Sequence, residues 1–231
     1  MRIVLMQISI VVPVFNESAT LPSLMQALQS WQSASHSNFE ILFVDGGSTD
    51  NTVAMLQKEG YRVISSSKGR AWQMNTGAAQ TQHNVLLFLH ADTQLPKQAL
   101  ELIDHALNEQ HCWGRFDVRI LGKPWMLKVV ARMMNWRSRI TGIATGDQAM
   151  FMTRDAFNQV GGFPGQALME DIEISKRLCK LSPPACISVP VLTSGRRWEE
   201  RGVWRTIVLM WRLRLAYWLG QKPDVLAKQY R

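Results

Sequence analysis

Residues 85 to 95 read VLLFLHADTQL, a run of five apolar residues that stops at His90, Ala91 and Asp92. A short apolar run between polar residues is typical of a strand that is buried on both faces of a sheet. Pro96 follows, and we expect it to open a helix, because the first helical turn needs no N–H at that position. Open α/β sheets bind their ligands at the carboxyl ends of the strands. Asp92 is therefore the first candidate for a site residue.

Three similar apolar runs precede this one, at residues 8–15, 39–44 and 61–64. Each leads through a polar or glycine-containing segment into residues with helical periodicity, and one such helix is expected over residues 52–58. Strands that alternate with helices predict a parallel sheet with crossover connections.

The second half of the sequence mixes the two patterns. Apolar and polar residues alternate over 116–121, as in a strand with one wetter face. An amphipathic helix is expected from Trp125 to Ile140, with Lys128, Arg132, Asn135 and Arg139 on its polar face. Further strands are expected at 148–153 and 187–191, helices at 154–160, 170–178 and 203–219, and a mobile loop at 193–202.

Length and composition favour one domain that spans residues 1–231, because 46% of the residues are apolar and can form a substantial core. The three cysteines, Cys112, Cys179 and Cys186, have no metal-like spacing, so we expect reduced thiols in a cytoplasmic protein. No apolar run reaches the roughly 18 to 20 residues of a spanning helix. An integral membrane segment is therefore not expected.

The net charge of +8 is concentrated toward the end of the chain. The carboxyl-terminal helix, expected over 203–219, has tryptophans on one face, Trp204, Trp211 and Trp218, and arginines on another, Arg205 and Arg212, in line with Arg201 just before the helix. Such a helix can make peripheral contact with the anionic inner face of a membrane, or its tryptophans can pack on the domain or on a second subunit of a homodimer. No nucleic-acid partner is expected, because no helix-turn-helix, zinc or RNP-like pattern is present.

Four motifs occur in order along the chain. They are PVFNE at 13–17, VDGGSTDNT at 44–52, HAD at 90–92, and GGF at 161–163 followed by MED at 169–171. Together they resemble the family 2 glycosyltransferases, which have the GT-A fold, over about residues 8 to 200. Within that family, the HADT and SGRRW segments resemble the small bacterial transferases associated with arsenosugar biosynthesis.

The resemblance implies a Rossmann-like, mostly parallel α/β sheet flanked by helices, in which residues 1–95 bind the nucleotide-sugar and residues 96–231 form the acceptor and catalytic half. It implies a nucleotide-diphosphate-sugar donor, with UDP favoured over GDP, and a divalent cation, Mn²⁺ or Mg²⁺. It also implies transfer of a hexosyl group, with inversion, to a hydroxyl acceptor that is either a small molecule or linked to a lipid.

The resemblance assigns donor binding to residues at the strand ends, at a basic helix start and in a late loop, namely Pro13, Phe15, Glu17, Asp45, Lys68, Arg70, Ala91, Asp92 and Arg197. Asp45 can accept a hydrogen bond from the base, or it can cap the next helix. Phe15 can stack on the base, or it can be a core residue. Lys68 and Arg70 suit a phosphate at a helix start, although a solvated surface pair is the alternative.

Asp92 matches a metal-binding acid, because hard divalent cations take carboxylate oxygens together with phosphates. The family pattern is D-x-D, and this chain has His90 in place of the first acid. We favour a packed, hydrogen-bonded His90. The alternatives are that it holds Asp92 or the metal from a second shell, or that it binds the metal itself.

Glu170 and Asp171 resemble the family's acidic pair, with Asp171 as the catalytic base and Glu170 orienting the acceptor. The alternative is that both acids only cap a helix dipole. The SGRRW segment resembles a degenerate Q-x-x-R-W motif with Ser194 in place of glutamine, which favours a non-processive enzyme. Arg197 is then expected to meet the diphosphate and Trp198 the acceptor.

Two other functions stay open. One is a nucleotidyltransferase, which also uses acidic metal ligands, although PVFNESATLP is not its usual glycine- and lysine-rich phosphate signature. The other is a degenerate protein that binds a nucleotide-sugar without turnover, which His90 in the D-x-D position makes conceivable.

Overall fold

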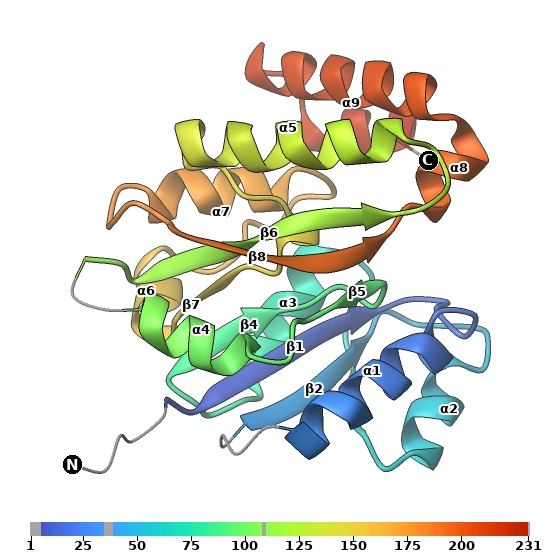
Figure 1. Ribbon diagram of the computed structural model, residues 1–231, viewed down its shortest axis with the longest axis vertical. Coiled ribbons are helices and arrows are strands. Elements are labelled where there is room, and N and C mark those ends of the chain that lie inside the picture. The colour runs from blue at the N-terminus through green and yellow to red at the C-terminus, as the bar shows by residue number, and fades with distance from the viewer. Residues whose placement is uncertain (1–5, 35–38, 108–109, 231) are drawn as a thin grey trace.

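The computed structural model describes residues 6–34, 39–107 and 110–230. Within these ranges the chain forms one curled sheet of eight strands in the order β3-β2-β1-β4-β7-β6-β8-β5, with helices on both faces (Figure 1). No helix in the described ranges is long and apolar enough to cross a membrane.

The first half forms the parallel part of the sheet. Its strands are β1 (Ile8–Val14), β2 (Phe39–Asp45), β3 (Arg62–Ser65) and β4 (Val85–Phe88). They are connected by α1 (Leu21–Ala34), α2 (Thr52–Lys58) and α3 (Arg70–Ala79). β1 pairs in parallel with both β2 and β4, and β2 with β3, as the alternation of strands and helices predicts.

Two apolar cores bury these strands from opposite sides. In β4, Val85 and Leu87 belong to the core that contains the α1 residues, whereas Leu86 and Phe88 belong to the core that contains the α3 residues. Side chains that alternate between two faces, both of them apolar, produce the uninterrupted VLLFL run. The prediction of a doubly buried strand at this position is confirmed.

The second half extends the sheet with antiparallel and parallel neighbours. Its strands are β5 (Thr93–Gln94), β6 (Trp113–Leu121), β7 (Phe151–Thr153) and β8 (Ala185–Ser194). Its helices are α4 (Ala99–Ala106), α5 (Met126–Thr141), the 3-10 turn η1 (Gly146–Gln148), α6 (Arg154–Gln159), α7 (Glu170–Leu178), α8 (Arg196–Arg201), α9 (Val203–Trp218) and α10 (Pro223–Tyr230). β7 runs antiparallel to β4 and β6, which joins the two halves.

Two expectations about local structure are wrong. Pro96 does not begin a helix: it follows the short strand β5, where the Thr93 and Thr193 hydroxyls lie 3.2 Å apart, and a turn leads to α4, which begins only at Ala99. Residues 193–202 are not a loop, because β8 continues to Ser194 and α8 follows. A strand of two residues is too short to show alternating apolar and polar residues. The polar composition of RRWEER did not indicate a helix.

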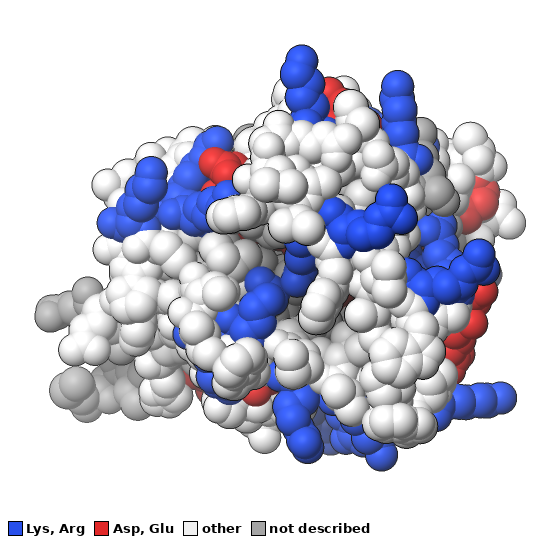
Figure 2. Space-filling model, turned by 90° about the horizontal axis from the view of Figure 1, so that it is seen from above, with Lys and Arg blue, Asp and Glu red and all other residues white. Residues whose placement is uncertain are grey.

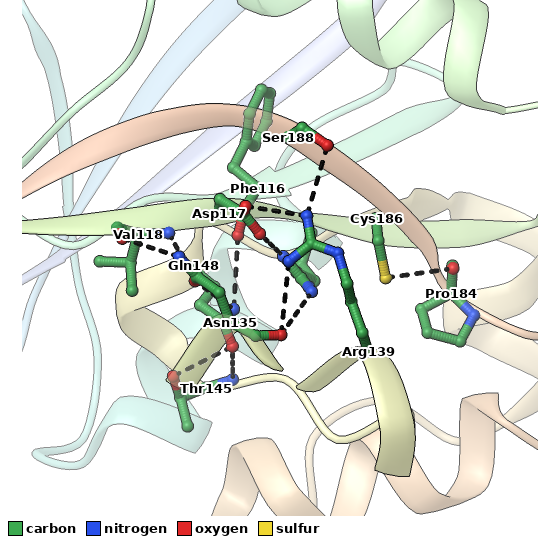
Figure 3. A network of polar contacts seen from close by, with 11 residues as sticks. Phe116, Asp117, Val118, Asn135, Arg139, Thr145, Gln148, Pro184, Cys186 and Ser188 are labelled. Atoms are coloured by element: carbon green, nitrogen blue, oxygen red, sulfur yellow. Dashed lines mark hydrogen bonds and ion pairs between the residues drawn. The ribbon is translucent and has the colours of Figure 1, made fainter. Parts of the chain in front are cut away.

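Asn135 is a further correction, because it lies on the inner side of α5 rather than on its polar face. Its side-chain amide donates to the Val118 carbonyl at 3.0 Å and accepts from the Val118 N–H at 2.9 Å, which fastens α5 to β6 (Figure 3). Gln148 of η1 joins the same network, and its side chain accepts from the Thr145 N–H at 3.1 Å. The Gln148 amide also lies 3.5 Å from the Phe116 carbonyl of β6 and from Oδ1 of Asn135, so the η1 turn, which contains Gly146 and Asp147, is fixed relative to the sheet.

Gln73 ties the ends of two parallel strands together from the first turn of α3. Its side chain is 3% exposed, and its Nε2 donates to the carbonyl of Val14 in β1 and to that of Val44 in β2, both at 2.8 Å. Gly46 passes close by, and a Cβ on it would lie 3.0 Å from the amide carbon of Gln73. The distance between the carboxyl ends of β1 and β2 is therefore fixed.

We expect Gln73→Leu to lower the free energy of unfolding by about 2 kcal/mol, because two buried carbonyls lose their donor. For a chain of this size the loss corresponds to a fall of roughly 4 to 8 °C in the melting temperature, measured by circular dichroism. Gln80→Leu, at the exposed end of the same helix, is the matched control. Equal melting temperatures for the two variants would contradict the role of Gln73.

Candidate functional site

The candidate site lies at the carboxyl edge of the parallel strands. Asp45 is the last residue of β2, Phe15 follows the end of β1, and Asp92 lies in the turn after β4. Because β2, β1 and β4 are neighbours that run in the same direction, these residues emerge at one edge of the sheet. This is the place where open α/β sheets bind ligands.

Asp45 is buried and does not cap α2, so the capping alternative is wrong. Its carboxylate accepts from the backbone N–H groups of Gly47 at 3.0 Å and Ser48 at 3.1 Å. Gly47 has φ +88°, a conformation that favours glycine. Asn51 is the N-cap residue of α2, and the acid that accepts from the first N–H of the helix, on Thr52, is Asp50, at 3.0 Å. Asp45 thus shapes the glycine turn at the sheet edge.

Phe15 is half-buried and lies outside both strand cores, so the alternative that it is a core residue is wrong. The ammonium group of Lys68 lies 3.8 Å from the centre of its ring. Pro13 is buried within β1, and the Glu17 carboxylate accepts from the Thr20 hydroxyl at 2.7 Å, next to the start of α1. The structure brings Phe15 and Lys68 together.

His90 packs against the η1 turn and pairs with an acid. Its Nδ1 lies 3.2 Å from Oδ1 of Asp147, and its ring leaves no room for a Cβ on Gly146. Burial opposes ionisation of Asp147, but the hydrogen bond from His90 and the charges of Arg70 and Arg197 outweigh it and hold the pKa of Asp147 below its ordinary value. The favoured interpretation of His90 as a packed, hydrogen-bonded residue agrees with this geometry.

Basic groups from two distant segments meet beside these acids. Arg70 begins α3, and Arg197 lies in α8. Burial and the charge of Arg70 lower the pKa of Arg197, whereas the charges of Asp147 and Asp92 oppose that shift. Arg197 therefore lies within electrostatic reach of all three residues, and its guanidinium also stacks on the Tyr230 ring, 4.8 Å from the ring centre.

Glu170 and Asp171 form the first turn of α7. The Asp171 carboxylate accepts from the Gly146 N–H at 3.1 Å and from the Ile172 N–H at 2.8 Å, so α7 is joined to the same η1 turn that contacts His90. Glu170 is buried, and burial together with the charge of Asp171 raises its pKa above the ordinary value. Burial thus favours the protonated form of Glu170, directly before the Asp171 carboxylate that the two backbone N–H groups hold in place.

Asp92 fits the role of an oxygen ligand for a divalent cation. It is half-exposed, and of its carboxylate oxygens Oδ1 accepts a long hydrogen bond, 3.4 Å, from the Thr93 hydroxyl. Ala91 is buried beside it, and Trp198 packs partly buried against the core that contains the α1 residues. Among the described residues no group of three or more His, Cys, Asp or Glu side chains is arranged to hold a metal alone. A cation here would need ligand oxygens from a phosphate as well.

Sequence reasoning missed two residues of this region, Gln73 and Asp147. The sequence does contain a signal for Asp147, because this acid directly follows Gly146 in the TGDQ segment. Asp45 and Gly46 form a similar pair of acid and glycine in the opposite order. Gln73 had none, since a glutamine in the first turns of a helix has the same pattern as a solvated residue.

The comparisons with known proteins identify one family by its sequence model and one fold by similar solved structures. The family model for glycosyl transferase family 2 matches residues 9–161. The TarS structure from S. aureus in complex with UDP-GlcNAc has a TM-score of 0.62 at 17% identity, over 82% of this chain and 58% of that one. A mannosyltransferase from Pyrobaculum calidifontis in complex with GDP-Man and Mn²⁺ has 0.63 at 18%, over 93% and 62%.

A third similar structure is glucosyl-3-phosphoglycerate synthase from Mycobacterium tuberculosis in complex with Mg²⁺ and UDP, with a TM-score of 0.59 at 18% identity, over 82% of this chain and 70% of that one. The chain spans less than two thirds of the TarS and mannosyltransferase chains that it matches. At these identities the likeness shows a shared fold, and the expected GT-A architecture is confirmed.

The raised pKa of Glu170 predicts a pH-dependent stability. The folded state favours the protonated carboxyl, so this group's contribution is complete below its ordinary pKa and is lost as the pH rises through the raised value. Glu170→Gln should therefore unfold at a higher temperature than the parent protein at about pH 8, and the difference should shrink toward about pH 4. Calorimetric melts across this range test the prediction, with the exposed Glu59→Gln as control. A difference that does not change with pH would exclude it.

Proposed function

The chain belongs to glycosyl transferase family 2, and on this basis we propose that it moves a sugar from a nucleotide-diphosphate-sugar to a hydroxyl acceptor, with inversion and one transfer per encounter. The observation that carries the proposal is the meeting of Asp92, Asp147, Arg70 and Arg197 beside the Glu170–Asp171 pair. Such a transfer requires one acid that binds a cation and another that accepts a proton. It also requires positive groups, such as guanidinium groups, that bind the diphosphate.

The donor is proposed to lie across the carboxyl ends of β1, β2 and β4. Asp45 sets the turn against which the base would lie, Phe15 provides a ring face once Lys68 turns toward a phosphate, and Arg70 begins a helix whose first N–H groups favour anions. Pro13, Glu17 and Ala91 shape this edge rather than carry charge to the phosphates. We favour UDP, with GDP as the alternative. The TarS structure contains UDP-GlcNAc, and the mannosyltransferase structure contains GDP-Man.

Asp92 is proposed to hold Mn²⁺ or Mg²⁺. When bound, the cation would stabilise the negative charge of the departing diphosphate. His90 is proposed to be a positioning residue rather than a ligand, because its Nδ1 is directed at Asp147 and its ring is packed on Gly146. Arg197 is proposed to add positive charge to the diphosphate side of the site.

Asp171 is proposed as the base. It would take the proton of the acceptor hydroxyl as the new bond to the anomeric carbon forms and the bond to the diphosphate breaks, which inverts the configuration. Its carboxylate accepts hydrogen bonds from two backbone N–H groups. These bonds fix the orientation of the carboxylate and leave other lone pairs free to accept the proton. Burial raises the pKa of Glu170 and so favours its protonated form, which would donate a hydrogen bond that orients the acceptor.

The acceptor is proposed to be a small molecule or a lipid-linked alcohol, bound on the side of α8 where Trp198 lies, and the reaction is placed in the cytoplasm. Ser194 in place of the glutamine of Q-x-x-R-W supports a non-processive enzyme. The assignment to the arsenosugar-associated subgroup stays a prediction. The nucleotidyltransferase alternative is set aside by family membership, whereas a donor-binding protein without turnover stays the competing proposal because of the His90–Asp147 pair.

We expect UDP or GDP to stabilise the protein only when Mn²⁺ or Mg²⁺ is present. A ligand at 100 times its dissociation constant adds about 2.7 kcal/mol, which is readily seen as a shift in melting temperature. Asp92→Asn should lose the metal-dependent part, while Asp224→Asn in the exposed first turn of α10 should retain it. Stabilisation that is equal with and without metal would exclude the metal proposal.

Asp171→Asn should lower the rate of sugar release from the donor by about 10² to 10⁴-fold, the usual contribution of a positioned base. Its nucleotide-induced shift in melting temperature should match that of the parent protein. Hydrolysis of UDP- or GDP-sugars, followed by nucleotide release, provides the assay without a known acceptor. Asp155→Asn, an exposed acid in the first turn of α6, is the matched control.

The outcomes separate the two proposals. Full activity in Asp171→Asn would overturn its role as base. Donor-induced stabilisation of the parent protein without any turnover would instead favour the protein that only binds a nucleotide-sugar.

A further inference from the structure

The outer sides of α5 and α9 are apolar where a solvated helix would be polar. In α9, Trp204, Trp211 and Trp218 are between 66% and 78% exposed. The expectation that these tryptophans pack on the domain is therefore wrong. Trp125, the N-cap residue of α5, and Trp136 within α5 are 71% and 60% exposed. Large exposed apolar patches usually mark sites where a protein binds another protein, a ligand or a membrane.

The exposed residues form a stripe on each helix. Along α5 they are spaced three or four residues apart, and along α9 likewise, namely Trp125, Val129, Met133, Trp136 and Ile140, and Trp204, Val208, Trp211, Leu215 and Trp218. Such spacing places each set on one side of its helix. We call the two stripes together the tryptophan face.

The opposite sides of the same helices hold the fold. Leu127 and Ala131 of α5 belong to the core that contains the α1 residues, while Leu213 of α9 packs with Met169 and Ile172 at the start of α7. Tyr217 of α9 also contacts Glu173 of α7 at 3.4 Å. No residue of the tryptophan face belongs to the apolar cores of the described chain, and the face is turned outward.

The two helices lie close together and are strongly basic. Figure 1 places α5 and α9 at one end of the molecule, away from α1 and α2, and Arg137 of α5 is near enough to Arg214 of α9 for its pKa to be lowered, mainly by burial and then by that charge. α5 contains four basic residues and α9 three, and neither contains an acid. Seen from the α9 side, Lys and Arg outnumber Asp and Glu around broad uncharged areas (Figure 2).

We propose that the tryptophan face docks the protein on an anionic lipid bilayer, with the tryptophans at the headgroup level and Lys128, Arg132, Arg205 and Arg212 against the phosphates. Exposed tryptophans combined with basic residues suit the interface between lipid and water. A second copy of the chain fits less well, because two such faces would bring like charges together. The proposal goes beyond the transfer reaction and does not depend on it.

Docking would place the catalytic side near the membrane surface. α9 packs on the first turns of α7, and that helix begins with Glu170 and Asp171. An acceptor hydroxyl on a lipid headgroup could then reach the proposed base without leaving the interface. Association would be peripheral, through one side of two helices.

The test is flotation of the 231-residue chain with vesicles of phosphatidylcholine containing phosphatidylglycerol, compared with vesicles of phosphatidylcholine alone. We expect binding to the anionic vesicles that weakens as salt is raised, because the charge contacts are screened. Bound tryptophans should also be quenched by brominated lipids.

Substitutions in the tryptophan face, compared with substitutions elsewhere, show whether this face is responsible for vesicle binding. The paired substitutions Trp211→Ser with Trp218→Ser, and Trp125→Ser with Trp136→Ser, should each reduce vesicle partitioning by about tenfold or more. Arg212→Glu should reduce it further at low salt. Trp72→Ser, a half-exposed tryptophan on α3, and Lys58→Glu, at the end of α2, should leave partitioning unchanged. Thermal melts confirm that every variant is folded.

Three outcomes would overturn the proposal. One is no binding to anionic vesicles at low salt, and another is equal loss of binding in the control variants. The third is a dimer in analytical ultracentrifugation that becomes a monomer when the tryptophans are substituted, while the parent protein does not bind vesicles. That result would identify a second copy of the chain as the occupant of the face.

Discussion

The double hydrogen bond from Gln73 to the carbonyls of Val14 and Val44 is the contact on which the geometry of the site depends. Parallel strands diverge at their ends unless something joins them there, because the ladder of backbone bonds stops. A buried amide that satisfies both carbonyls keeps β1 and β2 together to their last residue. Phe15 and Asp45 then leave the sheet from fixed positions, and the glycine turn after Asp45 has a defined start.

The η1 turn plays the equivalent part for the other half of the chain. Gly146 contacts three regions at once, since the His90 ring packs on it, its N–H binds Asp171, and the network of Asn135 and Gln148 holds the turn on β6. A side chain at this position would separate them. His90, two residues before the acid proposed for the metal, and Asp171, the proposed base, are thus placed relative to each other by one glycine.

Much of this architecture was predictable because the relevant signals are local. The apolar runs located the parallel strands, and the predicted helices over 52–58 and 170–178 match α2 and α7. What could not be predicted depends on contacts between distant segments. Thr93 becomes a strand residue only because Thr193 lies opposite it, and Asn135 turns inward only because Val118 offers a free carbonyl and N–H. His90 likewise acquires its partner from residue 147.

The exposed tryptophans of α9 are a different case from Thr93, Asn135 and His90. The sequence predicted the helix itself, and only the side that it turns toward the protein could not be predicted. Burial of Leu213 and the contacts of Tyr217 already fix which side of α9 faces the protein. The exposed side then adds nothing to folding, and apolar area left in water lowers solubility. A chain that keeps three tryptophans there, on a helix without a single acid, is better explained by an interface that lies outside the fold than by the fold itself.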